Sequence, residues 1–364
     1  MSSKKVKGLF DSVEKEEKKK GVILKQEREQ HHLDRKLQQV ADEKGQLASK
    51  YKESLKELTR VEGLLEFKEA LHDQEVKPLI IRPTEKKEIS ESTAVTIFSD
   101  VHVEERVLPE SVNGLNEYTP AICKVRSEKY FRTVVSLTNI LRHGTKIENL
   151  VLHLGGDNIS GYIHEELEET NYLSPIKATA YIRDIIVGGI DYLIKAGGFK
   201  QILIPCSVGN HGRLTKKTRH SSRVENNLEW YLYQELQHIF EDERKEKIVK
   251  FILPKGYHTL ITIYDWINRF HHGDAIKYYG AIGGIATSLN KKLMNWNQGS
   301  TADIDWFGHH HQEGYSRVHV SNGSVIGTTN YSLDNGFPFT DPTQVYALIS
   351  KHYGKNLHWS INLK

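Results

Sequence analysis

Five short polar motifs follow apolar, β-rich stretches of this chain, and together they supply carboxylates, imidazoles and one carboxamide. In order they are Asp100-Val101-His102, Gly156-Asp157-Asn158, Gly209-Asn210-His211, His272-Gly273-Asp274 and Gly308-His309-His310-His311. Side chains of these types bind divalent metals, and a set of this size can hold two ions with one carboxylate between them. Two adjacent ions activate water and clamp a phosphoryl group. The motifs therefore predict hydrolysis of a phosphoester.

The segments around the motifs predict an α/β fold. Strands are expected at residues 94–100, 149–157 and 201–210, alternating with helices at about 126–143, 175–196 and 222–245. This order is typical of a mainly parallel sheet with helices on its faces. The motifs then fall at the carboxyl ends of strands, which is where open α/β sheets collect their ligands.

After residue 245 the pattern changes to paired strands. These strands are expected at residues 248–253, 257–274, 303–309 and 315–329. Asn322-Gly323 is a hairpin turn signal. We therefore expect a second sheet packed on the first, so that the fold class is α/β, with two packed mixed β-sheets flanked by helices.

The N-terminal part differs in composition from the rest. Residues 11–72 contain no proline and are rich in Glu, Lys, Gln and Leu, and from Leu33 to Leu65 a 4-3 spacing of mostly apolar residues is interrupted only by Lys44 and Ser54. This pattern predicts a long helix with coiled-coil character. It could pair with a second copy or a protein partner, or lie along the catalytic domain. We expect a helical extension at 1–75, a linker at 76–92 and the catalytic domain at 93–364.

The composition excludes several protein classes. The 364 residues carry a net charge of +3, which is too small to indicate a nucleic-acid partner by itself. Cys123 and Cys206 lie far apart, and no stretch has the length and hydropathy of a signal peptide or a membrane span. A reduced, cytoplasmic setting is therefore expected, with no structural disulfide.

The ordered motifs resemble those of the calcineurin-like metallophosphoesterase superfamily, whose pattern is DxH, GDxxD, GNH(D/E), a lone His and GHxH. The resemblance covers residues 94 to about 330. In detail the chain looks most like members found in bacteriophage and bacterial genomes that are described as DNA-repair-exonuclease-like.

The resemblance implies a role for each motif residue. One metal would be held by Asp100, His102 and His311, the other by Asn210, His272 and His309, with Asp157 bridging the two. We prefer His272 to His271 because the lone His of the family usually precedes a small residue, here Gly273. We expect Mn²⁺, with Fe²⁺, Zn²⁺ or Mg²⁺ as alternatives, because mixed His/Asp/Asn ligation suits several of these ions.

The resemblance also implies that His211 is catalytic and assists the leaving oxygen. The chain departs from the family here. The acid that usually follows this histidine is Gly212, and the second acid of GDxxD is Ser160. If a carboxylate from elsewhere orients His211, Asp274 is the candidate. The departures concern proton transfer more than metal binding.

A basic segment directly after His211 indicates the substrate. Residues 213–223 contain no acid and five cations, which are Arg213, Lys216, Lys217, Arg219 and Arg223. Such a loop beside the metals would contact phosphates flanking the scissile one, and so favour a polyanion. The other interpretation is a solvated surface loop. Tyr278, Tyr279 and Trp296 could stack on bases or belong to the core.

Three functions remain open from the sequence. The first is a nuclease or phosphodiesterase acting on nucleic acid. The second is a protein serine/threonine or small-molecule phosphatase. The third is a non-catalytic coiled-coil scaffold with a retired phosphoesterase domain, which the presence of all seven ligand positions disfavours.

Overall fold

The computed structural model describes residues 3–73, 80–81, 90–241, 247–279 and 284–364. The chain divides into two compact units, residues 1–77 and 78–364. Most of the expected linker at 76–92 lies outside the described residues. Within it, β1 (Ile80–Ile81) is a strand, and β2 begins at Glu91.

The first unit is one helix, α1 (Ser3–Asp73). Its length follows from the absence of proline and the abundance of strong helix formers. Every side chain of α1 that the structure describes is exposed, including the apolar ones of the 4-3 seam.

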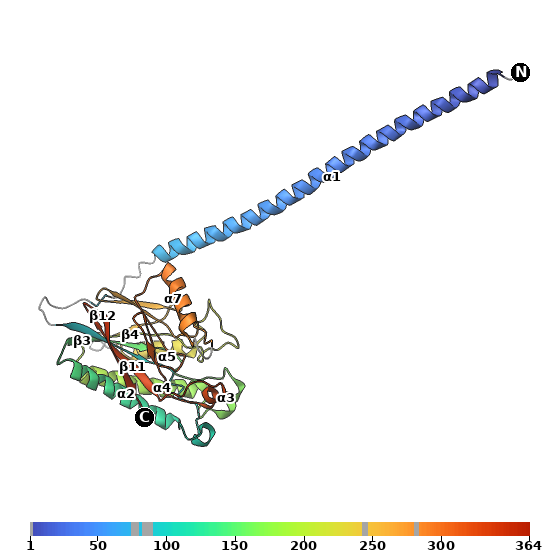
Figure 1. Cartoon of the computed structure of the whole chain (residues 1–364). Coiled ribbons are helices and arrows are strands. Elements are labelled where there is room, and N and C mark those ends of the chain that lie inside the picture. Colours follow the sequence, from blue (N-terminus) through green and yellow to red (C-terminus); the bar gives the residue numbers. More distant parts are fainter. Residues whose placement is uncertain (1–2, 74–79, 82–89, 242–246, 280–283) are drawn as a thin grey trace. The chain divides into compact units, whose positions relative to one another are not determined.

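The second unit contains two six-stranded sheets (Figure 1). The first has the order β12-β11-β2-β3-β4-β5. Its strands β2 to β5 are parallel, and β11 is antiparallel to both β2 and β12. The bounds are β2 (Glu91–Phe98), β3 (Lys146–Leu154), β4 (Gln201–Pro205), β5 (Val249–Ile252), β11 (Thr343–Ser350) and β12 (Gly354–Asn362).

The second sheet has the order β1-β6-β7-β8-β10-β9. In it β7, β8 and β10 are parallel, while β6 with β7 and β10 with β9 form antiparallel pairs. The bounds are β6 (Thr259–Ile263), β7 (Trp266–Phe270), β8 (Ile304–Phe307), β9 (Gly314–Tyr315) and β10 (His319–Ser321).

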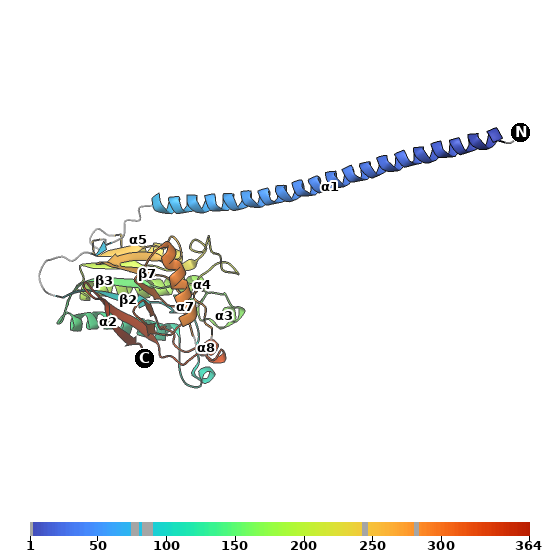
Figure 2. The same ribbon diagram turned by 45° about the horizontal axis from the view of Figure 1, so that its top comes forward.

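The buried strands explain the layering. Along β2 all eight residues are buried, because Ala94 and Phe98 join the core under the helices while Val95 and Ile97 join the core between the sheets. This is the two-residue period of a strand that is covered on both faces. The fold class predicted from the sequence is therefore confirmed (Figure 2).

Helices flank the sheets on both sides. Helices α2, α4 and α5 cover one face of the first sheet, and their apolar side chains form the larger core with it. Helix α7 packs in a small separate cluster against Phe307 at the end of β8. The bounds are α2 (Pro120–Leu141), α3 (Glu165–Thr170), α4 (Pro175–Ala196), α5 (Leu228–Ile239), α7 (Ala286–Gly299) and α8 (Asn330–Asp334), with a 3-10 turn at Pro109–Val112. No described helix has both the length and the hydropathy needed to cross a membrane.

Three local expectations were wrong. The segment 248–253, expected with the paired strands of the second sheet, contains β5 of the first sheet, which is parallel to β4. The helix expected over 222–245 is the shorter α5, which begins where the Asn227 side chain accepts a hydrogen bond from the Glu229 amide. The hairpin turn expected at Asn322-Gly323 does not form. Asn322 is buried, donates to Ser99 Oγ at 2.9 Å, and so ties the second sheet to the end of β2.

Candidate metal centre

The first cluster of candidate ligands joins the ends of β2 and β8. Asp100, His102 and His311 each offer a ligand atom, and these atoms all lie within 4.8 Å of one another. The Nε2 atoms of His102 and His311 face each other at 3.3 Å, and His311 Nε2 lies 3.5 Å from Asp100 Oδ1. Imidazole nitrogens that converge on a carboxylate in this way leave room for a cation between them.

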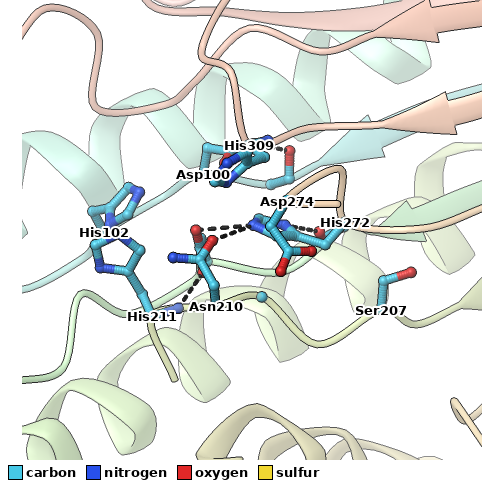
Figure 3. Close-up of polar contacts among 12 residues, drawn as sticks. Asp100, His102, Ser207, Asn210, His211, His272, Asp274 and His309 are labelled. Carbon is cyan, nitrogen blue, oxygen red and sulfur yellow. Dashed lines mark hydrogen bonds and ion pairs between the residues drawn. The ribbon is translucent and has the colours of Figure 1, made fainter. Parts of the chain in front are cut away.

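The second cluster joins the ends of β3, β7 and β8. Asp157, His272 and His309 form a group of the same tightness. His272 Nε2 lies 3.0 Å from Asp157 Oδ2 and 3.1 Å from Asn210 Oδ1. Figure 3 shows the Asn210 side chain beside His272 and joined to it by a dashed line. Asp157 also groups with His102 and His211, so this carboxylate lies between the two clusters.

The structure distinguishes His272 from His271. His272 Nδ1 donates to the Gly155 carbonyl at 2.8 Å, which fixes the tautomer and leaves Nε2 for a ligand. The fully buried ring of His271 instead stacks on Phe307, with its Nε2 3.3 Å from Asp305. His310, also buried for the most part, packs against His309 and Phe307.

Backbone strain is concentrated at these ligands. Only seven non-glycine residues of the described chain have a positive φ, and five of them are candidate ligands. Those five are Asp100, His102, Asp157, His309 and His311, with φ between 51° and 69°. Such conformations cost roughly 1–3 kcal/mol each and persist where the surroundings enforce them, most often at functional sites.

Close backbone approach explains the glycines of the motifs. A Cβ on Gly209 would lie 2.0 Å from Asp157 Oδ1, and one on Gly156 would lie 2.5 Å from the Gly209 nitrogen. The loops after β3 and β4 therefore touch, and only glycine allows it. This contact brings Asp157 next to Asn210.

The pKa shifts favour the metal-binding forms of His102, His309 and Asp157, whereas neighbouring carboxylates outweigh burial, raise the pKa of His272 and His311, and favour their protonated forms while no metal is bound. Burial lowers the pKa of His102 well below its usual range, and His211 and His311 lower it further. Burial raises the pKa of Asp157, but His272 and His211 outweigh burial and hold it well below its usual range. Burial lowers the pKa of His272, but Asp157 outweighs burial and raises it to about 10. Neutral imidazoles and an ionised carboxylate are the forms that bind metals.

The donor set fits two divalent metals. Four of its seven members are buried and three are partly buried, they converge on two points that share Asp157, and five of them have backbones in strained conformations that the surrounding contacts maintain. Asp100 is held in place by its neighbours, since its Oδ2 accepts from Ser99 Oγ and its Oδ1 accepts from the His309 amide. The seven positions named in the sequence are thus brought together.

Ser160 connects a first-cluster ligand to an acid that the sequence analysis missed. Its Oγ lies 2.9 Å from His102 Nδ1 and donates to Glu105 Oε2 at 2.8 Å. A carboxylate behind a ligating histidine orients the ring and raises its basicity. At Ser160 the hydroxyl relays this effect, so the acid expected at position 160 is supplied by Glu105.

Glu229 occupies the region of the acid expected at position 212. A Cβ on Gly212 would lie 2.5 Å from Asn227 Oδ1 and 2.9 Å from Glu229 Cγ, so no larger side chain fits. Glu229 is fully buried and accepts from the amides of Asn158 and Gly209 at 2.6 and 2.5 Å. It thereby clamps the loops that present Asp157 and Asn210.

His211 is oriented by a backbone carbonyl. Its Nδ1 lies 3.1 Å from the Ser160 oxygen, and a carbonyl can only accept, so Nδ1 is the donor and Nε2 remains free. Its amide donates to Asp157 Oδ1 at 2.8 Å. Asp274, the carboxylate expected to orient His211, instead accepts from Arg223 and Tyr257 at 2.8 and 3.1 Å. That expectation was wrong.

Two of the five cations in the basic segment 213–223 bind neighbouring groups of the protein, and three have no ion-pair partner among the described residues. Arg213 donates to the Asn210 carbonyl at 2.7 Å, and Arg223 pairs with Asp274. These two guanidinium groups therefore support the metal loops. Lys216, Lys217 and Arg219 are exposed, and no described residue forms an ion pair with them.

No protein-family model matches the sequence, and a search of curated proteins gave no match either. Among solved structures, the chain is similar to a dimetal phosphatase from Danio rerio, with a TM-score of 0.32, 10% identity, and coverage of 75% of this chain and 99% of that one. It is similar to a predicted phosphoesterase from Streptococcus pneumoniae, with a TM-score of 0.27, 11% identity and coverages of 74% and 97%. Zinc-bound Vps29 from Entamoeba histolytica gives a TM-score of 0.28, 11% identity and coverages of 74% and 99%.

Proposed function

We propose that this protein is a two-metal phosphoesterase that hydrolyses phosphodiester bonds of nucleic acid. The observation that carries the proposal is the convergence of seven candidate ligands on two points that share Asp157, with strained backbone at five of the seven. When bound, two divalent ions would activate water and neutralise phosphoryl oxygens. Asp100, His102 and His311 would hold one ion, and Asn210, His272 and His309 the other.

His211 has the geometry of the proton donor to the leaving oxygen. Its Nδ1 is engaged by the Ser160 carbonyl, while its Nε2 has no hydrogen-bond partner among the described residues. Its ring lies edge-on to His102, with centroids 4.7 Å apart, so it borders the first cluster. A protonated His211 can give its Nε2 proton to the departing alkoxide, which typically contributes 10²–10⁴-fold to the rate.

The substrate class is inferred from the cations without partners. Lys216, Lys217 and Arg219 follow His211 along the chain and are exposed. Cations held near a metal centre favour a substrate with several phosphates, because each contact to a phosphate releases counterions from a polyanion. A small monoester has no further phosphates to meet them.

A substrate comparison tests the proposal. The metal-stripped protein is reloaded with Mn²⁺ and offered single-stranded DNA, duplex DNA, RNA and a phosphomonoester. Cleavage of at least one oligonucleotide, at a higher kcat/KM than the monoester, is expected. Release of phosphate from the monoester alone would make the protein a phosphatase. Failure to bind metal at all would favour a scaffold.

A further inference from the structure

A pocket lies next to the metal centre. It has a volume of about 730 Å³ and lies between the basic segment, residues 254–257 and helix α7. The lining residues used below are Arg223, Trp230, Lys255, Tyr257, Lys292 and Trp296. We call this the flanking pocket.

The flanking pocket adjoins the second ligand cluster. Asp274 lines it and comes two residues after His272, and Figure 3 shows Asp274 beside His272 and Asn210. Arg223 lines the flanking pocket and also a smaller hollow, which is bordered by the ligand Asn210. A phosphodiester at the metals would therefore place the group on one side of its phosphorus in the direction of the flanking pocket.

The pocket offers aromatic surface. Tyr257, Trp296 and Trp230 contribute to its wall, and all three are only partly buried. The Tyr257 ring is fixed by its hydroxyl contact to Asp274 and by the Arg223 guanidinium, which lies 4.8 Å from the ring centroid. Rigid aromatic rings at a wet cleft are stacking platforms for nucleic-acid bases.

The charge of the wall is positive. Arg223, Lys255 and Lys292 outnumber the acids Asp274 and Glu225, and Asp274 is already paired with Arg223. Cations beside aromatic rings suit a ligand that carries both a flat base and a phosphate. Neither a phosphoserine peptide nor a small aliphatic monoester would use both features.

We propose that the flanking pocket binds the nucleoside adjacent to the scissile phosphate. The inference rests on the proposed function, because it names a subsite of that same reaction. The base would pack against the exposed part of Trp296, beside the Tyr257 ring that Arg223 and His271 cover, and the next phosphate would meet Lys255 and Lys292.

Two phosphodiesters that share a p-nitrophenyl leaving group test this inference. They are thymidine 3′-phosphate 5′-(p-nitrophenyl phosphate), which carries a base and a second phosphate, and bis-p-nitrophenyl phosphate, which carries neither, both with Mn²⁺. Lys292→Glu and Trp296→Leu are each expected to lower kcat/KM about tenfold on the nucleoside ester and less than about twofold on the other diester. Lys291→Glu is the matched control, because Lys291 is exposed on the same helix and does not line the pocket.

The possible outcomes distinguish a failure of the flanking pocket from a failure of the proposed function. Equal effects of Lys292→Glu on both diesters, or no effect on either, would overturn the flanking pocket while leaving the phosphodiesterase in place. A wild-type protein that hydrolyses neither diester would instead remove the proposed function. Because Trp296 also contacts His258 and His271, the melting temperature is measured alongside, and Lys292→Glu decides the result if Trp296→Leu unfolds.

A separate inference comes from the seam of α1. From Leu37 to Val61 the seam positions alternate in steps of three and four, and the six apolar members that flank Lys44 and Ser54 are 46–69% exposed. Those six are Leu37, Val40, Leu47, Tyr51, Leu58 and Val61. The seam fits a second copy of this helix. In one register each apolar seam residue faces an apolar residue of the second copy, and each polar one faces a polar one.

That register is antiparallel. In this register the numbers of any two residues that face each other add up to 98. Leu37 therefore packs against Val61, Val40 against Leu58 and Leu47 against Tyr51 of the second copy. The polar positions Lys44 and Ser54 then meet each other, so the ammonium finds a hydroxyl acceptor. Shifting by one heptad would put both polar residues against apolar ones.

The parallel arrangement is less complementary. In register, Lys44 would face Lys44 of the second copy inside the seam. The flanking charges do not separate the two arrangements, because Glu57 would approach Glu62 in the parallel pair, while Lys50 would approach Lys50 and Glu43 would approach Glu57 in the antiparallel one. The burial of Lys44 against Lys44 inside the seam is what disfavours the parallel pair. We propose that two copies pair through α1 in the antiparallel register centred near residue 49.

Spin-label distances in the full-length protein test the register. Labels are placed by Ala48→Cys or by Asp34→Cys, and the native Cys123 and Cys206 are buried. The two labels at position 48 are expected close together, because this position lies near the twofold axis of the antiparallel pair. The two labels at position 34 should be about 45 Å apart, since each lies about fifteen residues from the centre and the helix rises 1.5 Å per residue. Short distances at both positions would establish a parallel pair and overturn the register. A monomer by light scattering would overturn the pairing itself.

Discussion

The ligand clusters and the basic segment 213–223 lie next to each other, yet they are built in opposite ways. The candidate ligands are buried or partly buried, their rings are held by named hydrogen bonds, and five of them have strained backbone. The three free cations of the segment are exposed and have no ion-pair partner among the described residues. A reaction centre must be rigid to act, whereas a surface that follows a polyanion needs only charge within reach.

This difference predicts a gradient of mutational effects. Changes to the ligands should abolish chemistry on every substrate. Changes to their supports should weaken metal binding, and changes to the free cations should affect only substrates with several phosphates.

The largest effect is expected for Asp157→Ala. Asp157 lies between both clusters, so its loss should remove at least one metal and lower the hydrolysis rate roughly 10³-fold on any phosphoester. Metal content by elemental analysis and turnover of a chromogenic diester measure this. His310→Gln is the control, because His310 lies between two ligands and packs against Phe307. Equal metal loss in both variants would undo the assignment of ligands.

Next in size is His211→Asn. The contact of His211 with Asp157 is made by the backbone amide and survives this substitution, so both metals should remain bound while kcat falls about 10²–10⁴-fold. A substrate with a good leaving group needs less proton donation, so p-nitrophenyl esters should be affected less than oligonucleotides. The same loss on both substrates would contradict a role for His211 in protonating the leaving oxygen.

A smaller effect is expected for the supports Glu229→Gln and Ser160→Ala. Glu229→Gln leaves a weaker acceptor for the amides of Asn158 and Gly209, and Ser160→Ala breaks the relay between His102 and Glu105. Metal affinity should fall about 10–100-fold, with activity restored at high metal concentration. Isothermal titration with Mn²⁺ is the measurement, and unchanged affinity in both variants would reduce these residues to a purely structural role.

The smallest effect on chemistry is expected for Lys216→Glu combined with Lys217→Glu. Affinity for an oligonucleotide should fall about tenfold and depend less on salt, because fewer counterions are released on binding. Hydrolysis of a small ester should change less than about twofold. An equal loss on both substrates would mean that the segment supports the metal centre as a whole and does not contact substrate.

The sequence predicted the buried part of the centre better than its supports. Ligand types at strand ends can be read from the chain, since residue spacing and strand periodicity place them at one edge of a sheet. Glu229 and Glu105 carry no such signal, because each reaches the centre through a contact formed only in the folded chain. Asp274 illustrates the converse, since it was expected to orient His211 but pairs with Arg223 in the folded chain, and the Ser160 carbonyl accepts from His211 instead.

The fold shows the same limit. Alternating strands and helices predicted the first sheet, and the paired strands after residue 245 predicted the second. Asn322-Gly323 carried a turn signal, but Asn322 is buried and hydrogen-bonds to Ser99 instead. A turn signal indicates local preference only, and here tertiary hydrogen bonds to Ser99, Gln344 and Val345 outweigh it.

The most direct test of the two-metal assignment is a stoichiometric titration. The protein is stripped with a chelator, Mn²⁺ is added stepwise, and hydrolysis of bis-p-nitrophenyl phosphate is followed at each step. Activity should be absent without metal and should reach its maximum only as the second equivalent binds. Full activity in the chelator, or a maximum at one equivalent, would contradict a centre in which Asp157 joins two metals.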